Sequence, residues 1–154
     1  MLRKLFVPFA LNCAFIAFVV VLAGGSGGFA YLVDLPSLIV ALVAPFIVAM
    51  VTHGPSRAMH AFSCPFDPEA GSDELASARS FFICFLRYLV AFTVFAVVTG
   101  SIMLLGYLSE ENLVMIGRNL AIALLALFYG SVGSILFILP FLSEIDRRIA
   151  GGRL

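Results

Sequence analysis

Residues 119–143, NLAIALLALFYGSVGSILFILPFLS, carry no charged side chain. A helix of about 20 apolar residues spans the hydrocarbon core of a bilayer, so this stretch predicts a membrane-crossing helix. Its small residues Ala126, Gly130 and Ser134 recur every four positions and therefore share one helix face. Because small side chains let helix backbones approach closely in lipid, we expect this face to pack against other helices.

The chain as a whole has the composition of an integral membrane protein. Of its 154 residues, 62% are hydrophobic and 12% are charged, whereas a soluble domain carries about 25% charged residues. The net charge is zero, so nothing indicates nucleic acid as a partner. The apolar runs predict an all-α fold with four transmembrane helices in a single membrane domain, 1–154, with spans at about 5–23, 35–52, 81–108 and 117–143.

The basic residues predict the orientation of these spans. Eight of the nine Lys and Arg fall on one side, namely Arg3, Lys4, Arg57, Arg79, Arg87, Arg147, Arg148 and Arg153, and only Arg118 falls on the other. Positive loops stay in the cytoplasm, so both termini and the segment 53–80 are predicted to be cytoplasmic. A cleaved signal peptide is the alternative for the N-terminus, but its apolar run exceeds the usual 7–15 residues.

The cytoplasmic segment is short and partly ordered. Residues 56–62 can form a surface helix, and the Pro/Gly-rich residues 64–72 predict a loop. Ser72 or Asp73 is expected to cap the next helix. That helix is predicted to run unbroken into the third span, which makes the third helix extend into the cytoplasm.

No enzyme signature is present, and we expect neither catalysis nor a cofactor. His53, His60 and Cys64 could be assembled into a metal site. Three ligands without a fourth, and without a recognised spacing, favour two interfacial histidines and a buried thiol instead.

The acidic residues all lie outside the four apolar runs, namely Asp34, Asp67, Glu69, Asp73, Glu74, Glu110, Glu111, Glu144 and Asp146. Ion-coupled membrane machines usually hold a carboxylate within the membrane to take up and release the ion. If this chain takes part in ion flow, a partner must therefore supply that carboxylate.

Three stretches in order resemble the MotA/TolQ/ExbB proton-channel family. They are IGRNLAIALLALFYGSVGSILFILPF (116–141), GGFAYLVDLPSLIVAL (27–42) and TGSIMLLGYL (99–108), and the first is closest to the MotA pattern. The resemblance implies a multi-pass protein of the bacterial inner membrane. It also implies a homo-oligomer, by family a pentamer, around a single-span partner of the MotB/ExbD/TolR type that supplies the ion-binding Asp.

The resemblance also defines candidate pore or helix-packing residues, namely Thr93, Gly100, Ala126, Gly130, Ser131, Ser134 and Pro140. The family lines its ion path with a Thr on each of the last two helices, and here those positions hold Val97 and Leu127. Thr93 and Ser131 lie one turn away on the same faces and are possible substitutes. A hydroxyl bonded back to its own helix is the commoner arrangement.

Two functions follow from these residues. In the first, the chain is a minimal subunit of an ion-driven motor or channel complex, assembled around a single-span partner. In the second, it is a non-conducting scaffold or accessory protein derived from the same family. The short segment 53–80 leaves no room for the torque-generating cytoplasmic domain of MotA, so direct action on a flagellar rotor is not expected.

Overall fold

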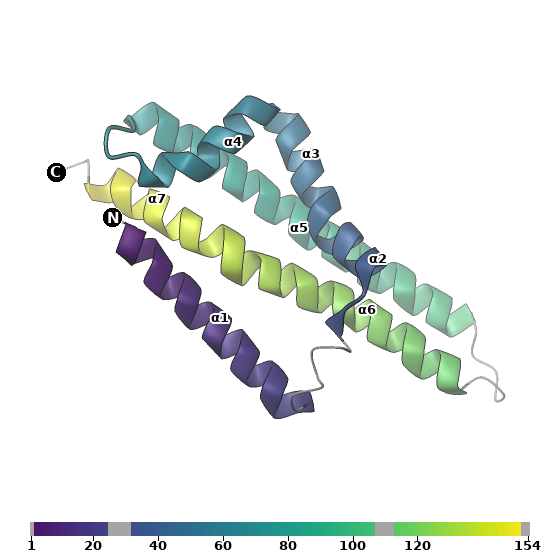
Figure 1. Ribbon diagram of the computed structural model, residues 1–154. Helices are drawn as coiled ribbons and strands as arrows, with labels where there is room; N and C mark the ends of the chain where they lie inside the picture. The colour runs from purple at the N-terminus through teal and green to yellow at the C-terminus, as the bar shows by residue number, and fades with distance from the viewer. Residues whose placement is uncertain (1, 25–31, 107–112, 152–154) are drawn as a thin grey trace.

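The protein folds as a bundle of helices (Figure 1). The computed structural model describes residues 2–24, 32–106 and 113–151, and within these ranges it contains helices and turns but no strand. The elements in chain order are α1 Leu2–Gly24, α2 Leu35–Leu38, η2 Ile39–Val43, α3 Ala44–His53, α4 Pro55–Ser63, η3 Cys64–Phe66, α5 Ser72–Gly106, α6 Leu113–Gly133, η4 Ser134–Ile138 and α7 Leu139–Gly151.

Within the described residues, three helices are long and apolar enough to cross a membrane. They are the continuous rod α2–η2–α3 at Leu35–His53, α5 at Ser72–Gly106, and the part Asn119–Gly151 of the rod α6–η4–α7. The apolar part of α1, Phe6–Leu22, is shorter than these three. The predicted all-helical membrane protein is therefore confirmed at this level, whereas the first predicted span, 5–23, and the orientation stay predictions.

The third helix is extended, as the sequence predicts. α5 has 35 residues and is therefore about 52 Å long, against a hydrocarbon core of about 30 Å. Its cap differs from the expected Ser72 or Asp73. The Leu75 amide donates to the Gly71 carbonyl at 3.1 Å, and the Gly71 amide donates to Glu74 Oε2 at 3.1 Å. Gly71 is thus the N-cap, and Glu74 closes the turn from the third helical position.

The fourth helix does not end near residue 143. It continues through α7 to Gly151, so Pro140 lies inside the rod rather than at its end. The proline is accommodated by the π-helical turn η4, in which the Leu139 amide donates to the Ser134 carbonyl. The rod α2–η2–α3 has the same combination of a π-turn and a proline, since the Ala44 amide donates to the Ile39 carbonyl directly before Pro45. A π-turn widens the helix at the point where a proline lacks its amide hydrogen.

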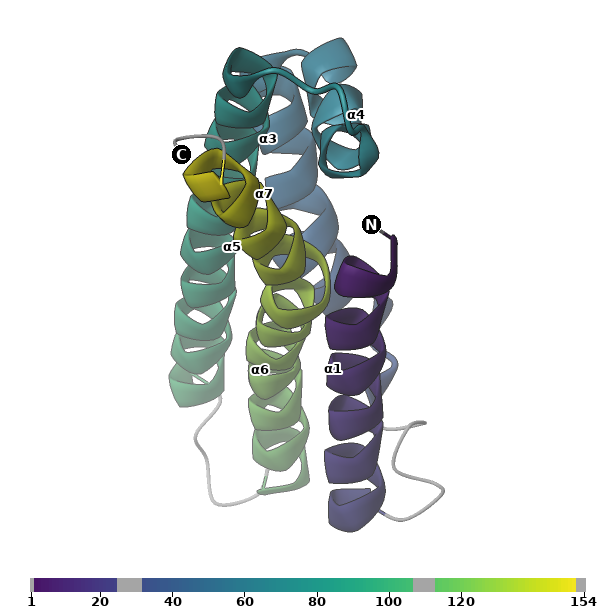
Figure 2. The ribbon, with the colours of Figure 1, turned by 90° about the vertical axis from the view of Figure 1, so that its left-hand side faces the viewer.

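One end of the bundle is closed by α4 and a cluster of aromatic rings. Gly54 adopts φ 84°, a left-handed conformation that glycine tolerates, and so turns the chain from α3 into α4. Phe62 of α4 packs edge-on against Phe81 and Phe82 of α5 and Phe141 of α7, with ring centroids 5.2–5.8 Å apart. The start of α1 and the end of α7 lie at this same end (Figures 1 and 2).

Candidate functional site

α5 and α6 pack against each other along a seam that contains glycines. A Cβ at Gly100 would lie 2.9 Å from the Cβ of Ala123, and a Cβ at Gly130 would overlap the hydroxyl of Thr93. Ala126 is buried along the same face of α6, between Ala123 and Gly130. Of the small residues singled out in the sequence, Gly100 and Gly130 therefore pack within one chain, between α5 and α6.

Thr93 lies at the centre of this seam. Its side chain is 6% exposed, and its hydroxyl has no hydrogen-bond partner within the part of the chain that the structure describes. A buried hydroxyl without a partner costs free energy, because its desolvation is not repaid. Among the described residues, Thr93 therefore carries a buried hydroxyl that packing alone does not satisfy.

The serines of α6 and η4 are satisfied locally. Ser131 Oγ donates to the Leu127 carbonyl at 2.9 Å, and Ser134 Oγ donates to the Gly130 carbonyl at 2.9 Å. Both are bonds to the carbonyl four residues earlier in the same helix. Ser131 is exposed whereas Thr93 is buried, so the two candidate hydroxyls do not share one surface.

Tyr129 holds the chain that leads into α2, a role that the sequence did not reveal. The Asp34 amide donates to Tyr129 Oη at 2.8 Å, and the Tyr129 hydroxyl itself donates to the Leu32 carbonyl. Asp34 then caps α2, because its Oδ2 accepts the Ser37 amide at 2.9 Å. The order Asp-Leu-Pro-Ser is a recognisable start signal for a helix, with an N-cap followed by proline in the first turn.

Pro140 leaves a backbone carbonyl without its helical donor, and a side chain of α1 donates to that carbonyl. In the pattern of η4 the next amide would donate to the Ile135 carbonyl, but residue 140 is a proline and has no amide hydrogen. Asn12 Nδ2 of α1 donates to the Ile135 carbonyl instead, at 3.1 Å. The polar side chain of α1 is therefore fixed by a carbonyl that the proline leaves free.

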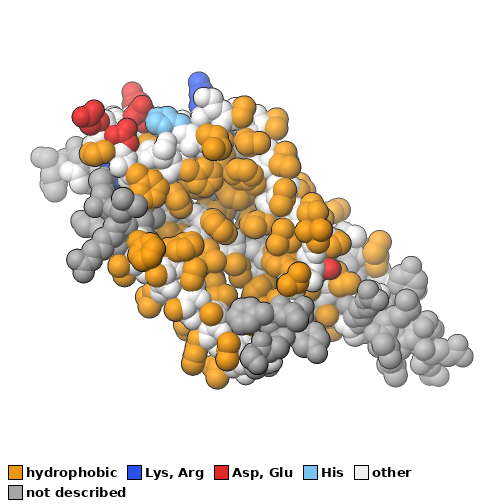
Figure 3. All heavy atoms as spheres, in the orientation of Figure 1, with side chains coloured by type: hydrophobic (Ala, Val, Ile, Leu, Met, Phe, Trp, Pro, Cys, Tyr) orange, Lys and Arg blue, Asp and Glu red, His pale blue; other side chains and the backbone are white. Residues whose placement is uncertain are grey.

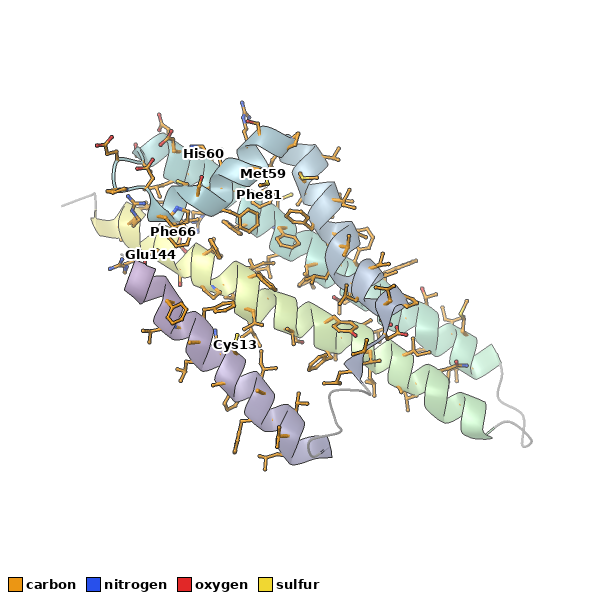
Figure 4. All side chains as sticks on the ribbon, in the orientation of Figure 1. Cys13, Met59, His60, Phe66, Phe81 and Glu144 are labelled. Carbon is orange, nitrogen blue, oxygen red and sulfur yellow. The ribbon has the colours of Figure 1, made fainter. Side chains whose placement is uncertain are left out.

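The histidines and Cys64 lie at the α4 end and do not converge. His60 Nε2 is 3.5 Å from Glu74 Oε1, whereas His53 Nε2 is 3.4 Å from Ser80 Oγ. Burial raises the pKa of the Cys64 thiol, and the neighbouring carboxylate of Glu74 adds to this. No group of three metal-binding side chains occurs among the described residues. Figure 4 shows His60 on α4 and Cys13 on α1.

Salt bridges fasten α7 at the same end. Glu144 is 6% exposed and its Oε2 accepts from Arg147 Nε at 2.9 Å, while Arg79 Nε of α5 donates to Asp146 Oδ1 at 2.6 Å. Arg148 Nη1 donates to the Cys64 carbonyl at 2.9 Å. The Arg79–Asp146 pair connects α7 to α5 and the Arg148 bond connects it to η3, whereas Glu144 and Arg147 both belong to α7.

Comparisons of the chain with protein-family models, with curated proteins and with solved structures gave no match. The site is therefore interpreted from its own residues.

Proposed function

We propose that this protein is a membrane subunit of an ion-driven motor or channel complex, similar to the MotA/TolQ/ExbB family, in the bacterial inner membrane. It forms an oligomeric ring around a single-span partner that supplies the ion-binding Asp. α1 is the first of four spans in each subunit, and both termini and α4 face the cytoplasm.

The observation that carries the proposal is the meeting of the three stretches that resemble the family. Ser37 Oγ of the second span donates to the Ile122 carbonyl of α6 at 3.4 Å, close to the Asp34–Tyr129 bond. Gly100 of the third stretch packs against Ala123 of α6. A resemblance scattered along the sequence thus corresponds to one contiguous packing unit, formed by α2, α5 and α6.

The placement of charge supports a partner that brings the carboxylate. Asp34 is the acidic residue nearest to a span on the side opposite α4. Its carboxylate caps α2 by accepting the Ser37 amide. Glu144 is paired with Arg147. Neither is left to bind a mobile ion in the bilayer centre, where an ion-coupled machine places its carboxylate.

The non-conducting scaffold is the second candidate, and the state of the hydroxyls favours it. Ser131 is bonded to its own helix and Thr93 is enclosed between α5 and α6. The positions that resemble the family's pore threonines hold Val97 and Leu127.

Co-purification and flux measurements separate the two functions. The chain is expressed with and without a neighbouring gene product that has one span with an Asp, and proton flux is measured in liposomes with a pH-sensitive dye. The channel subunit forms a ring and conducts only with the partner. A scaffold forms an assembly without partner-dependent flux. A chain that stays monomeric with every such partner contradicts both.

Thr93→Val tests the seam hydroxyl in the same assay. If the hydroxyl takes part in ion passage, flux falls at least tenfold while the assembly stays intact. Thr52→Val is the matched control, because it removes a hydroxyl that bonds the Val48 carbonyl on the exposed side of α3. Equal flux in both variants would exclude Thr93 from the ion path.

A further inference from the structure

The backbone carbonyl of Val40, in η2, has no donor from its own helix. The Ala44 amide, which would donate to it in a regular α-helix, donates to the Ile39 carbonyl instead. The next residue is Pro45, which has no amide hydrogen. Among the described side chains, none donates a hydrogen bond to the Val40 carbonyl. This carbonyl is therefore left without a donor by the described part of the chain.

The rod α6–η4–α7 contains the same arrangement with a donor in place. Ile135 stands five residues before Pro140, which is the spacing of Val40 and Pro45. The π-turn and the proline likewise leave the Ile135 carbonyl without a donor from its own helix. Asn12 Nδ2 of α1 donates to that carbonyl at 3.1 Å. The protein thus pairs one of two equivalent carbonyls with a side-chain amide of a neighbouring helix.

The Val40 carbonyl lies toward the outer side of its rod. A carbonyl in a helix points along the axis toward the residue four positions later, which here is Ala44. Val40 and Ala44 are half-buried, and the flanking Ile39, Val43 and Ile47 are 46%, 37% and 47% exposed. Figure 3 shows hydrophobic side chains along this rod. Because the side chain of Ala44 is small, another helix can approach the carbonyl closely.

A bilayer makes an unpaired carbonyl at this position unfavourable. The rod Leu35–His53 is long and apolar enough to cross a membrane, and Val40 is its sixth residue. Within the hydrocarbon there is no bulk water, so each backbone polar group needs a protein partner. Acyl chains have no hydrogen-bond donor and cannot supply one. The surface around Val40 therefore calls for a helix that carries a donor, rather than for lipid.

A second copy of this chain has no free side-chain amide at the depth of Val40. The sequence contains three asparagines and no glutamine. Asn12 is already bound to the Ile135 carbonyl. Asn112 precedes the last apolar run and Asn119 is its first residue, whereas Val40 is the sixth residue of its own span. The amide donor is therefore expected from a different polypeptide.

We propose that a transmembrane helix of another membrane protein packs along the exposed side of α2–η2–α3 and donates an Asn or Gln side-chain amide to the Val40 carbonyl. The contact has the chemistry of the bond from Asn12 to Ile135. Apolar side chains give little selectivity in lipid, so the amide distinguishes this helix from other membrane helices. The inference applies equally to a channel subunit and to a scaffold, because it does not involve ion flow.

The absence of tryptophan from the sequence permits a site-specific test. Val43→Trp places one tryptophan beside the Val40 carbonyl, and Phe95→Trp places one on α5, where Phe95 is 64% exposed. Each variant is reconstituted into phosphatidylcholine vesicles with a nitroxide-labelled polyleucine transmembrane peptide. The sixth membrane residue of this peptide is either Asn or Leu. Tryptophan quenching is measured against the mole fraction of peptide, kept low to limit association of the peptide with itself.

We expect the Asn peptide to quench the tryptophan at 43 at a mole fraction roughly three- to tenfold lower than the Leu peptide needs, as one amide bond between membrane helices predicts. The tryptophan at 95 should respond equally to both peptides. Pro45→Ala should abolish the difference at 43, because alanine supplies an amide hydrogen within the helix. Pro36→Ala is the matched control, since Pro36 lies in the first turn of α2, where an amide has no helical acceptor.

Ala44→Leu is a second variant, used if Pro45→Ala does not fold, and it should abolish the difference by covering the carbonyl. Equal quenching by both peptides at 43 would overturn the proposal. A difference that persists in Pro45→Ala or Ala44→Leu would show that the amide binds elsewhere. Quenching at 43 by a nitroxide-labelled second copy, and by neither peptide, would identify the chain itself as the occupant. The assay contains no ion gradient, so these outcomes are separate from the flux measurement.

Discussion

α1 and α6 are apolar helices of similar length, 23 and 21 residues, but they are held in opposite ways. α6 buries Ala123, Ala126, Gly130 and Gly133 against its neighbours. α1 buries Val20 among its described side chains and otherwise presents large residues, including Phe6, Phe15 and Phe18, at its surface. In a membrane, apolar character does not distinguish a packed helix from a loosely attached one. The size of the side chains on the contact face does.

The attachment of α1 is correspondingly specific and narrow. Its polar anchor is the hydrogen bond from the Asn12 side-chain amide to the Ile135 carbonyl. Phe6 and Phe9 of the same helix line an apolar groove against η4 and α7. The α5–α6 seam depends instead on continuous close contact, with Gly100 at Ala123 and Gly130 at Thr93. Three main substitutions, two of them with companion variants, test how the helices are held.

Gly130→Ala should have the largest effect, because the new Cβ overlaps Thr93 Oγ1 and lies 3.0 Å from its Cγ2. Overpacking of this kind costs about 1–3 kcal/mol of unfolding free energy. The measurement is SDS-induced unfolding in mixed micelles, followed by circular dichroism.

Gly117→Ala on the same helix is the control, since no described atom lies within 4 Å of its Cβ position. It should be neutral or stabilising by about 0.5–1 kcal/mol, because alanine favours the helix. Adding Thr93→Ala to Gly130→Ala should recover part of the loss. Equal stability of the two glycine variants would refute a close seam.

Asn12→Leu should have a smaller effect, because it removes a single hydrogen bond between two apolar helices. Such bonds contribute about 0.6 kcal/mol on average. Hydrogen exchange should rise in α1 while α5 and α6 keep their protection.

Pro140→Ala sharpens this test, because alanine has the backbone amide hydrogen that proline lacks and can donate it to the Ile135 carbonyl. In that background Asn12→Leu should cost less than in the native chain, so that the double-mutant cycle shows coupling. Additive effects would mean that Asn12 does not act through the carbonyl left free by the proline.

Arg79→Gln should have the smallest effect. The Arg79–Asp146 pair joins α5 to α7 at 2.6 Å, but both side chains are 47% exposed. Exposed ion pairs contribute about 0.2–1 kcal/mol and weaken with salt. Unfolding measured at low and high salt should converge for the native chain and the variant. A loss comparable to that of Gly130→Ala would mean that charge, rather than close packing, holds α7 in place.

Much of the fold could be predicted from the sequence, because long charge-free runs indicate membrane helices. The extended third helix also followed from the expected helix start at Ser72 or Asp73, directly before a long apolar run. The course of the fourth helix past Pro140 could not be predicted, because a proline within a helix usually marks an end and the π-turn that accommodates it has no sequence signature.

The candidate site was less predictable than the fold. Small residues on one face indicated packing, but not that the partner face would hold Thr93. The bond from Asn12 to Ile135 joins residues 123 positions apart, and no local pattern connects them. Tyr129 was similarly recognised only through its position in the resemblance, although Asp34 and its following proline carried a readable capping signal.

The π-turn η4 also resets the angular phase of the longest rod. Buried positions along α6 advance by three or four residues through Ala123, Ala126, Gly130 and Gly133, but the next buried residue is Ile138, five positions later. Successive residues of an α-helix are 100° apart, so a single wide turn moves the buried stripe by most of one such step. The same rod can therefore press glycines against α5 in the membrane and Ile138, Glu144 and Ile145 against a different set of neighbours at the α4 end. Removal of one residue from 134–138 would rotate these two stripes relative to each other and uncouple one half of the helix from its neighbours.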